Sequence, residues 1–260
     1  MNAMYTRPLL RAAHTQRGFT LVELMVTVGI ALFLLWGLTT VMQNVRQANL
    51  NQQGLAQLQD EERFALTVIT DVVQSGGYLP DATVWTSATS LPAGGNFTLA
   101  GQAFYGALNA PTGYSLSVRY RTGNSDGVIL CDGSSNTAAP PGSQYYTNTF
   151  TVVLGAPGQV GGLYCQLQVG NLAPQAAVLL VPAVQSMTVY FGVKRDFTFD
   201  DYNVDTYVTP DLMTANDWNN ISAVRVILTF NNPMANQPGQ PPSITFERVI
   251  EVMARGGVHT

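Results

Sequence analysis

The chain opens with a basic segment, which is followed by a long apolar run and then by a segment with helical periodicity. Between Phe19 and Met42 the only ionisable side chain is Glu23. About 20 apolar residues cross a bilayer as a helix, so the run is long enough for a membrane span. A secretory signal peptide has a shorter apolar core and a small-residue cleavage site after it. No such site follows this run, so we expect the segment to be retained in the mature protein.

The residues before the apolar run are basic. They include Arg7, Arg11 and Arg17 and no acidic residue. Cytoplasmic flanks of membrane helices carry an excess of Lys and Arg. The pattern therefore predicts a cytoplasmic N-terminus, with the rest of the chain on the other side of the membrane.

Beyond the run the chain becomes amphipathic, and we predict one helix from Phe19 to about Ser75. Apolar residues recur there at steps of three and four, which is typical of a helix with one buried face; they are Leu55, Leu58, Ala65, Ile69 and Val72. Ser75-Gly76-Gly77 should end the helix, and Pro80 lies just beyond.

The remainder of the chain predicts short strands separated by Gly, Pro, Asn and Ser. The segments that alternate or that form short apolar runs are Tyr114–Tyr120, Gly127–Cys131, Thr149–Leu154, Leu163–Val169, Val184–Val193, Ala223–Phe230 and Ile244–Met253. The stretch from Leu79 to Gly113 is rich in Ala, Thr, Gly and Ser and is interpreted as a variable loop region. The predicted fold class is α+β.

The junction between the basic segment and the apolar run resembles a known processing signal. Arg17-Gly18-Phe19-Thr20-Leu21-Val22-Glu23-Leu24-Met25 resembles the class III signal of type IV pilins and type II secretion pseudopilins. In that family a prepilin peptidase cuts after the glycine and methylates the new N-terminus. The resemblance implies cleavage between Gly18 and Phe19, N-methylation of Phe19, and an assembly role for Glu23. An ordinary single-pass anchor is the alternative.

Glu23 needs a physical reason to lie in an apolar helix, because a lone carboxylate in lipid is costly. Cleavage would free an amine at Phe19, about one helical turn away. The resemblance implies that Glu23 of one subunit pairs with this amine of a neighbour and sets the register during assembly. The alternative is a carboxylate that extends to the lipid headgroups. Many major pilins carry a proline where this chain has Thr40, so melting of the helix inside a filament is less assured here.

A second set of segments resembles PilW-type minor pilins. They are Leu58–Leu66 with its Arg63-Phe64-Ala65-Leu66 element, the Ser75–Tyr78 exit, and the strand segments from Val184 onward. Arg63 either pairs with an acid such as Asp60 or is a solvated helix charge. The resemblance covers the first and last thirds of the chain and leaves the middle unmatched.

The resemblance implies the type IV pilin fold, a long N-terminal helix packed on an antiparallel β-sheet. The expected parts are a leader (1–18), the membrane-spanning half of the helix (19–42), its amphipathic half (43–76) and a periplasmic or extracellular β-rich domain (77–260).

The implied function is that of a minor pilin that primes assembly of a type IV pilus or forms its tip, and so supports twitching motility. The implied partners are other minor pilins, the major pilin, the prepilin peptidase and the inner membrane; the protein would later reach the pilus. The alternatives are a J-type minor pseudopilin of type II secretion, a tip adhesin or DNA-uptake module, and a periplasmic enzyme on an anchor.

The charge of the mature chain argues against general nucleic-acid binding. Without the three leader arginines, nine basic residues (12 − 3) face 16 acidic ones, which gives a balance of −7. Such a chain repels phosphates, and its single lysine, Lys194, offers little for a basic patch.

The two cysteines, Cys131 and Cys165, are expected to pair, because thiols on the oxidising side of a membrane usually do. Two buried free thiols are the alternative. A zinc site is a poor fit, since two Cys without nearby His supply too few ligands.

The sequence shows little sign of catalysis. The only histidines are His14, in the leader, and His259, near the C-terminus, so no triad forms around a central histidine. We therefore predict a non-enzymatic protein without a cofactor.

A short acidic segment gives a weak calcium candidate. Asp201, Asn203 and Asp205 copy the first ligand positions of a calcium loop. Thr206 and Leu212 then stand where that loop needs Gly and Glu, so our prediction is a solvated loop without a metal site, and weak calcium binding is the alternative.

Several aromatic residues are predicted in or near loops. Trp85, Trp218 and the pair Tyr145-Tyr146 either contact a partner, as aromatic anchors often do, or cap the core.

Overall fold

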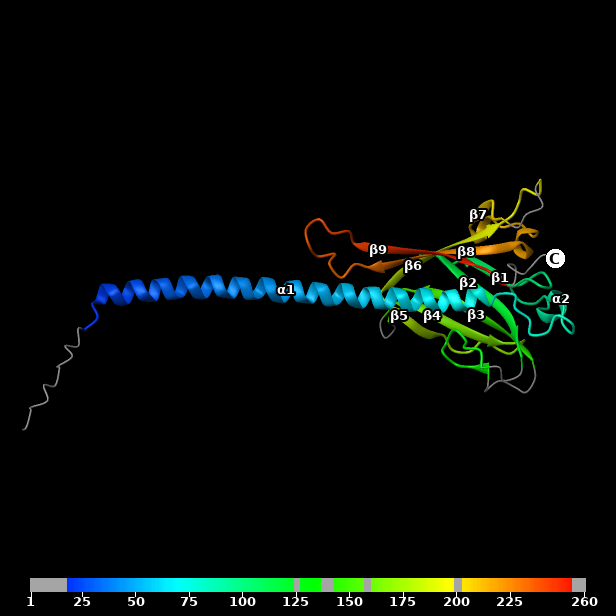
Figure 1. Ribbon diagram of the computed structural model, residues 1–260, viewed down its shortest axis with the longest axis horizontal. Helices are drawn as coiled ribbons and strands as arrows, with labels where there is room; N and C mark the ends of the chain where they lie inside the picture. The colour runs from blue at the N-terminus through cyan, green and yellow to red at the C-terminus, as the bar shows by residue number, and fades with distance from the viewer. Residues whose placement is uncertain (1–17, 124–126, 137–142, 157–159, 199–202, 254–260) are drawn as a thin grey trace, which may run out of the picture. The chain divides into compact units, whose positions relative to one another are not determined.

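The computed structural model describes residues 18–123, 127–136, 143–156, 160–198 and 203–253 (Figure 1). The chain divides into two compact units, residues 1–52 and 53–260. The first helix, α1 (Leu21–Gln74), runs through both units. His14, His259 and the leader arginines lie outside the described residues.

The predicted long helix is confirmed, with 54 residues. Within the second unit one face of α1 is buried, as the three- and four-residue steps predicted; the buried residues are Leu58, Ala65, Leu66, Ile69, Val72 and Val73. The helix ends where Gly77 adopts a φ of 78°. Glycine reaches this left-handed conformation without the steric cost that other residues incur.

The strands are antiparallel and form two sheets rather than one. The first sheet follows chain order and contains β1 (Phe104–Leu108), β2 (Tyr114–Thr122), β3 (Gln144–Val153), β4 (Gly162–Val169) and β5 (Val178–Pro182). The second has the order β7-β6-β8-β9 and contains β6 (Val184–Val193), β7 (Thr206–Val208), β8 (Ile221–Asn231) and β9 (Ser243–Glu251). The short helices α2 (Ser87–Ser90), η2 (Pro210–Leu212) and η3 (Asp217–Asn219) lie in the connections.

The chain passes from the first sheet to the second at Ala183. This residue has a φ of 62°, and its carbonyl accepts a hydrogen bond from the Asn231 amide at the end of β8 (2.9 Å). A non-glycine residue in this region is uncommon and marks a sharp change of direction. One residue therefore separates β5 from β6, which belong to different sheets.

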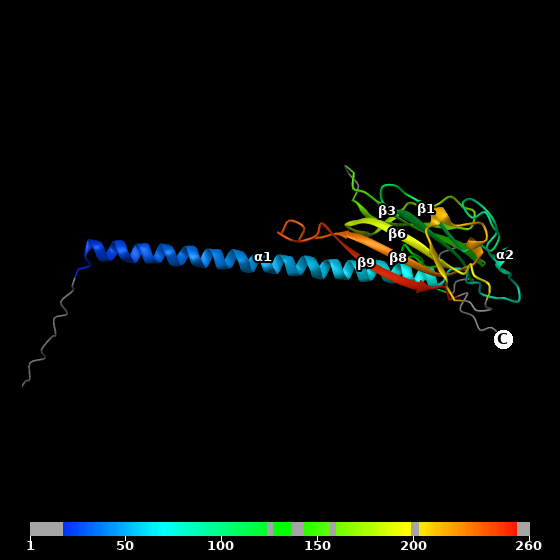
Figure 2. The ribbon, with the colours of Figure 1, turned by 90° about the horizontal axis from the view of Figure 1, so that it is seen from above.

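One hydrophobic core joins the second part of α1 to both sheets. Figures 1 and 2 show this part of the helix running beside the strands. Leu66 and Ile69 of α1 are fully buried together with Phe150 of the first sheet and with Phe191 and Phe230 of the second. The helix is therefore an integral layer of the domain, and the α+β antiparallel fold class is confirmed.

One predicted strand does not form, one region interpreted as a loop is partly regular, and two strands were not predicted. Gly127–Cys131 forms no strand and has only an isolated bridge, between Ile129 and Ser135. The Leu79–Gly113 region, interpreted as a loop, contains α2 and β1. β5 and β7 were missed, because β5 has five residues and β7 three, too few to show a clear alternation.

Candidate processing and assembly site

The segment that resembles the processing signal lies at the very start of α1. Gly18, Phe19 and Thr20 precede the first helical residue, Leu21, and all three are exposed; the Phe19 side chain is 77% exposed. A peptidase needs accessible, non-helical backbone to cleave, and the Gly18–Phe19 bond meets this condition. Whether it is cut stays a prediction.

Thr20 caps the helix on which Glu23 lies. The Glu23 amide donates a hydrogen bond to Thr20 Oγ1 (3.3 Å), and the Leu24 amide donates to the Thr20 carbonyl (3.1 Å). A carboxylate in the first turn is also favoured by the helix dipole. Sequence analysis missed this role of Thr20, although Thr-x-x-Glu before an apolar run is a known capping signal.

The first part of α1 presents apolar side chains outward on all sides. Every residue from Leu21 to Leu50 is exposed, and Trp36, for example, is 72% exposed. By length and composition α1 can cross a membrane. A buried core helix passes the same test, but the exposure of this stretch excludes that interpretation, and the helix continues to Gln74 without a break. The exposed run needs either lipid or other helices around it.

The end of α1 is fixed to β2 by its backbone. The Gly77 amide donates to the Arg119 carbonyl (2.9 Å), and the Arg121 amide donates to the Tyr78 carbonyl (2.9 Å). Gly76 leaves no room for a side chain, because a Cβ there would lie 2.3 Å from Cζ of Phe104. The Gly-Gly-Tyr exit that the sequence singled out is thus a close-packed contact between helix and sheet.

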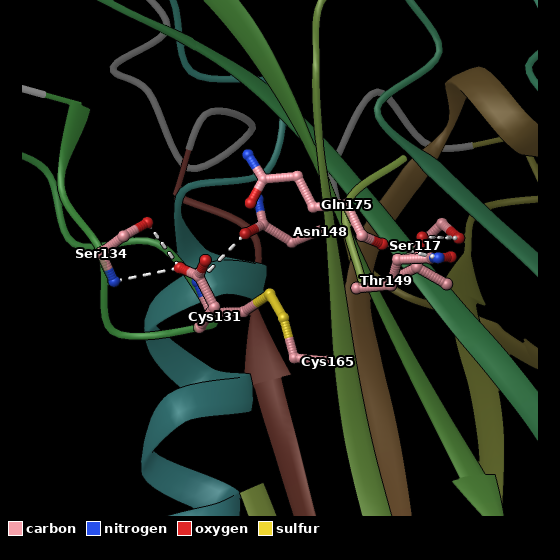
Figure 3. The surroundings of a disulfide bond; sticks show 9 residues. Ser117, Cys131, Ser134, Asn148, Thr149, Cys165 and Gln175 are labelled. Atoms are coloured by element: carbon pink, nitrogen blue, oxygen red, sulfur yellow. Dashed lines mark hydrogen bonds between the residues drawn. A yellow bond between two sulfur atoms is a disulfide. The ribbon is translucent and has the colours of Figure 1, made fainter. Parts of the chain in front are cut away.

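The predicted disulfide is present and fixes a turn-rich segment to the sheet. Cys131 and Cys165 are bonded across 34 positions, with Cα atoms 6.1 Å apart, and both are buried. Figure 3 shows that the Cys131 amide donates to Oδ1 of Asn148 on β3 (3.1 Å) and that Ser134 is bonded to its own turn. The bridge therefore joins the segment 127–136 to β4.

Two arginines on β2 are buried, which sequence analysis did not predict. Arg119 donates to the carbonyls of Gln102 and Pro92, and its guanidinium lies 3.9 Å from the centroid of the Phe97 ring. Burial lowers the pKa of Arg119 to about 10. Within the described chain no carboxylate pairs with it.

Arg121 binds the same connection through the Ser90 carbonyl and the Trp85 ring, whose centroid lies 4.0 Å from its guanidinium. It also donates to the carbonyl of Ser143, directly before β3. Carbonyl and ring contacts on cations therefore fasten the segment between α1 and β1 over one face of β2. No local sequence signal marks these residues, because the loop that covers them is distant in the chain.

The weak calcium candidate is only partly described, since Asp201 lies outside the described residues. The Asp205 carboxylate accepts the amides of Arg195 (2.9 Å) and Asp196 (2.6 Å). These bonds, that of Asp196 first, lower the pKa of Asp205. Within the described residues no group of three metal-ligating side chains occurs, and Asp205 already has a structural role.

An ion pair between the exposed Arg195 and the buried Asp217 closes the connections around β7. Arg195 Nη2 lies 2.6 Å from Oδ2 of Asp217, and the Thr214 amide donates to the same oxygen (2.8 Å). The Arg195 hydrogen bond is the main reason why the pKa of Asp217 lies below its usual value. The side chain of Asp217 is almost fully buried, so this pair orders the segment between β7 and β8.

The aromatic residues weighed as partner contacts are mostly structural. Tyr145 and Tyr146 are buried on β3, and Trp218 stacks on Tyr105 with ring centroids 5.6 Å apart. The core-capping interpretation is therefore confirmed for these three. Arg63 is exposed on α1, as the solvated-charge interpretation expects.

Two regions of the chain match models of known protein families. Residues 13–39 match the prokaryotic N-terminal methylation motif, and residues 136–251 match the model of type IV pilus-assembly protein W. No curated protein matches the chain in sequence. The second match begins at residue 136 and so does not test the resemblance drawn for Leu58–Tyr78. The matched regions contain the proposed processing signal and the strands β3 to β9, and the chain is a type IV pilus-assembly pilin of the PilW type.

Proposed function

We propose that this chain is a minor pilin that primes assembly of a type IV pilus or forms its tip. The observation that carries the proposal is the pairing of a methylation-motif match over residues 13–39 with an exposed apolar helix start and a PilW match over residues 136–251. The role is structural, because these features serve anchoring and association. In this proposal residues 1–18 are a leader, 19–42 cross the inner membrane, 43–76 continue the helix, and 77–260 form a periplasmic domain that later reaches the pilus.

Assembly would begin with cleavage between Gly18 and Phe19 by the prepilin peptidase and methylation of the new amine. Glu23 then has a partner in the amine of a neighbouring subunit. Two features support this pairing. The Glu23 backbone amide is bonded to Thr20, whereas its carboxylate makes no bond within the described chain. An unpaired carboxylate among apolar side chains gains most from an opposite charge.

Deletion of the gene tests the proposed function directly. We expect loss of surface pili and of twitching, restored by the wild-type gene, with type II secretion unchanged. Intact pili with lost secretion would assign the chain to a pseudopilus and refute the proposal. Normal pili and twitching with lost adhesion or DNA uptake would instead indicate a binding module.

Replacement of Glu23 by Gln tests the assembly contact. The variant should insert into the membrane and lose its leader normally, because insertion depends on the apolar run, but its amount in sheared pili should fall at least about tenfold, as the loss of a charge pair in an apolar setting implies. Glu62→Gln is the matched control, since Glu62 lies on the same helix beyond the apolar run. Normal incorporation of the Glu23 variant would contradict the pairing.

A further inference from the structure

The last strand, β9, forms a long open edge of the second sheet. It has nine residues and pairs only with β8. The Val252 amide donates to the Ser222 carbonyl (2.9 Å) and the Asn232 amide to the Pro242 carbonyl (3.1 Å), so even-numbered positions direct their backbone groups to β8. Backbone direction alternates along a strand. The backbone groups of the odd-numbered positions 245–251 therefore point away from the sheet and bond to no other backbone in the described chain.

Beside the end of this edge lies a cavity of about 570 Å³. Alternate positions of β9 and its continuation line the cavity, namely Val249, Glu251 and Met253. Tyr207 of β7 lines its opposite side. Val249 and Met253 are 51% and 64% exposed.

Between Tyr207 and β9 the cavity is lined by Ser222 and Ala223 of β8. The register places Tyr207, Gly192, Ala223 and Glu251 in one row across the four strands. At Gly192 this row is already filled, because a Cβ there would lie 2.9 Å from Val204 Cγ1 and 3.1 Å from Tyr207 Cε1.

The charges on this edge differ in their pairing. Glu247 is bound by Arg225, whose Nη2 and Nε both lie 2.8 Å from its oxygens. Glu251, by contrast, makes no hydrogen bond or ion pair within the described residues. A second copy of the chain would bring the same two acids to the shared edge, where like charges oppose pairing.

From these observations we propose that β9 receives an extended segment of another pilus subunit, which adds a strand to the sheet and directs an arginine or lysine side chain to Glu251. Main-chain hydrogen bonds to positions 245–251 supply affinity, and the cavity supplies specificity for alternate side chains. That the partner is a pilus subunit rests on the proposed function, whereas the chemistry of the edge does not.

The test uses the mature full-length chain in detergent and a fluorescent peptide of alternating valine and arginine, with glutamate in place of arginine as the control peptide. Fluorescence anisotropy should detect binding of the arginine peptide only. Hydrogen exchange should slow at Thr245, Glu247, Val249 and Glu251 when the peptide binds and stay unchanged at the even-numbered positions between them. Equal binding of both peptides, no binding, or protection elsewhere would overturn the proposal.

Two substitutions make the test specific. Val249→Pro removes an outward amide, which an edge strand tolerates, and should weaken binding about tenfold, whereas Val249→Ala keeps the amide and should lose less. Glu251→Lys should reverse the preference between the two peptides, and it decides the matter if the proline variant does not fold.

Ultracentrifugation without peptide should show a monomer; a dimer that Val249→Pro abolishes would make a second copy the occupant and overturn the basic partner. The peptide test does not require pilus assembly. Peptide binding can therefore fail while gene deletion still abolishes pili, and peptide binding can succeed while deletion leaves pili intact.

Discussion

Removal of the Cys131–Cys165 disulfide should destabilise the domain by an amount that follows from its position in the chain. The bond closes a loop across 34 positions. The chain-entropy relation for a loop of this size gives a loss of about 12.6 cal/mol/K in the unfolded state, or about 3.8 kcal/mol at 25 °C. We therefore expect the double variant Cys131→Ala/Cys165→Ala to lose roughly 4 kcal/mol of unfolding free energy.

The native fold of this variant should survive. The Cys131 amide keeps its hydrogen bond to Asn148, and β4 keeps its ladder to β3. Both cysteines are buried, so the missing sulfur atoms leave a small void that adds to the loss. A domain of this size shifts its melting temperature by about 2–4 °C per kcal/mol, which predicts a fall in Tm of roughly 8–16 °C.

Urea unfolding of the mature chain, followed by circular dichroism with and without reductant, measures the effect. Reductant should lower the stability of the wild type to near that of the double variant and should not change the variant itself. The m value of the variant should rise, because its unfolded chain is less constrained. A loss below about 1 kcal/mol would show that the bridge does not act through the unfolded chain.

Two further substitutions test individual contacts of the domain. Gly76→Ala should cost about 1–3 kcal/mol, because the new Cβ meets Phe104, whereas Gly94→Ala, with open space around it, should cost far less; chemical unfolding compares them. Asp217→Asn tests pH dependence. Because the folded pKa of Asp217 is lowered, its pairing stabilises the fold fully above about pH 4 and is lost as the pH falls through the lowered pKa. Stability of the wild type should therefore fall more steeply in acid than that of the variant, and equal slopes would contradict this.

The parts of the fold that were predictable are those in which one local pattern decides the outcome. The boundaries of α1 followed from unbroken periodicity and from Gly76-Gly77, and Val184–Val193 was predicted with its observed bounds because its alternation is long. The division into two sheets was not predictable. It depends on the left-handed conformation of Ala183. Alanine rarely adopts this conformation, so the sequence carries no signal for it.

The environment of β2 shows why alternation can mislead. Its apolar positions face the core, and no local pattern predicted that the arginines between them are buried as well. In the structure positions 116–122 are buried on both faces, because the connection between α1 and β1 covers Arg119 and Arg121. A residue's polarity predicts its environment only when nothing folds over it, and the covering segment lies about 20 positions or more earlier in the chain. The candidate processing segment had no such dependence, since all its information is local.

The two units of the chain separate folding from association. The domain formed by residues 53–260 buries its own core and carries its own disulfide, whereas the apolar side chains before residue 52 have no partner inside the described chain. Glu23 variants should therefore change assembly without changing the unfolding of the domain, and the cysteine variant should change unfolding first. If the cysteine variant, still folded at 25 °C, also failed to enter pili, then the segment 127–136 that the bridge holds would itself take part in contacts between subunits.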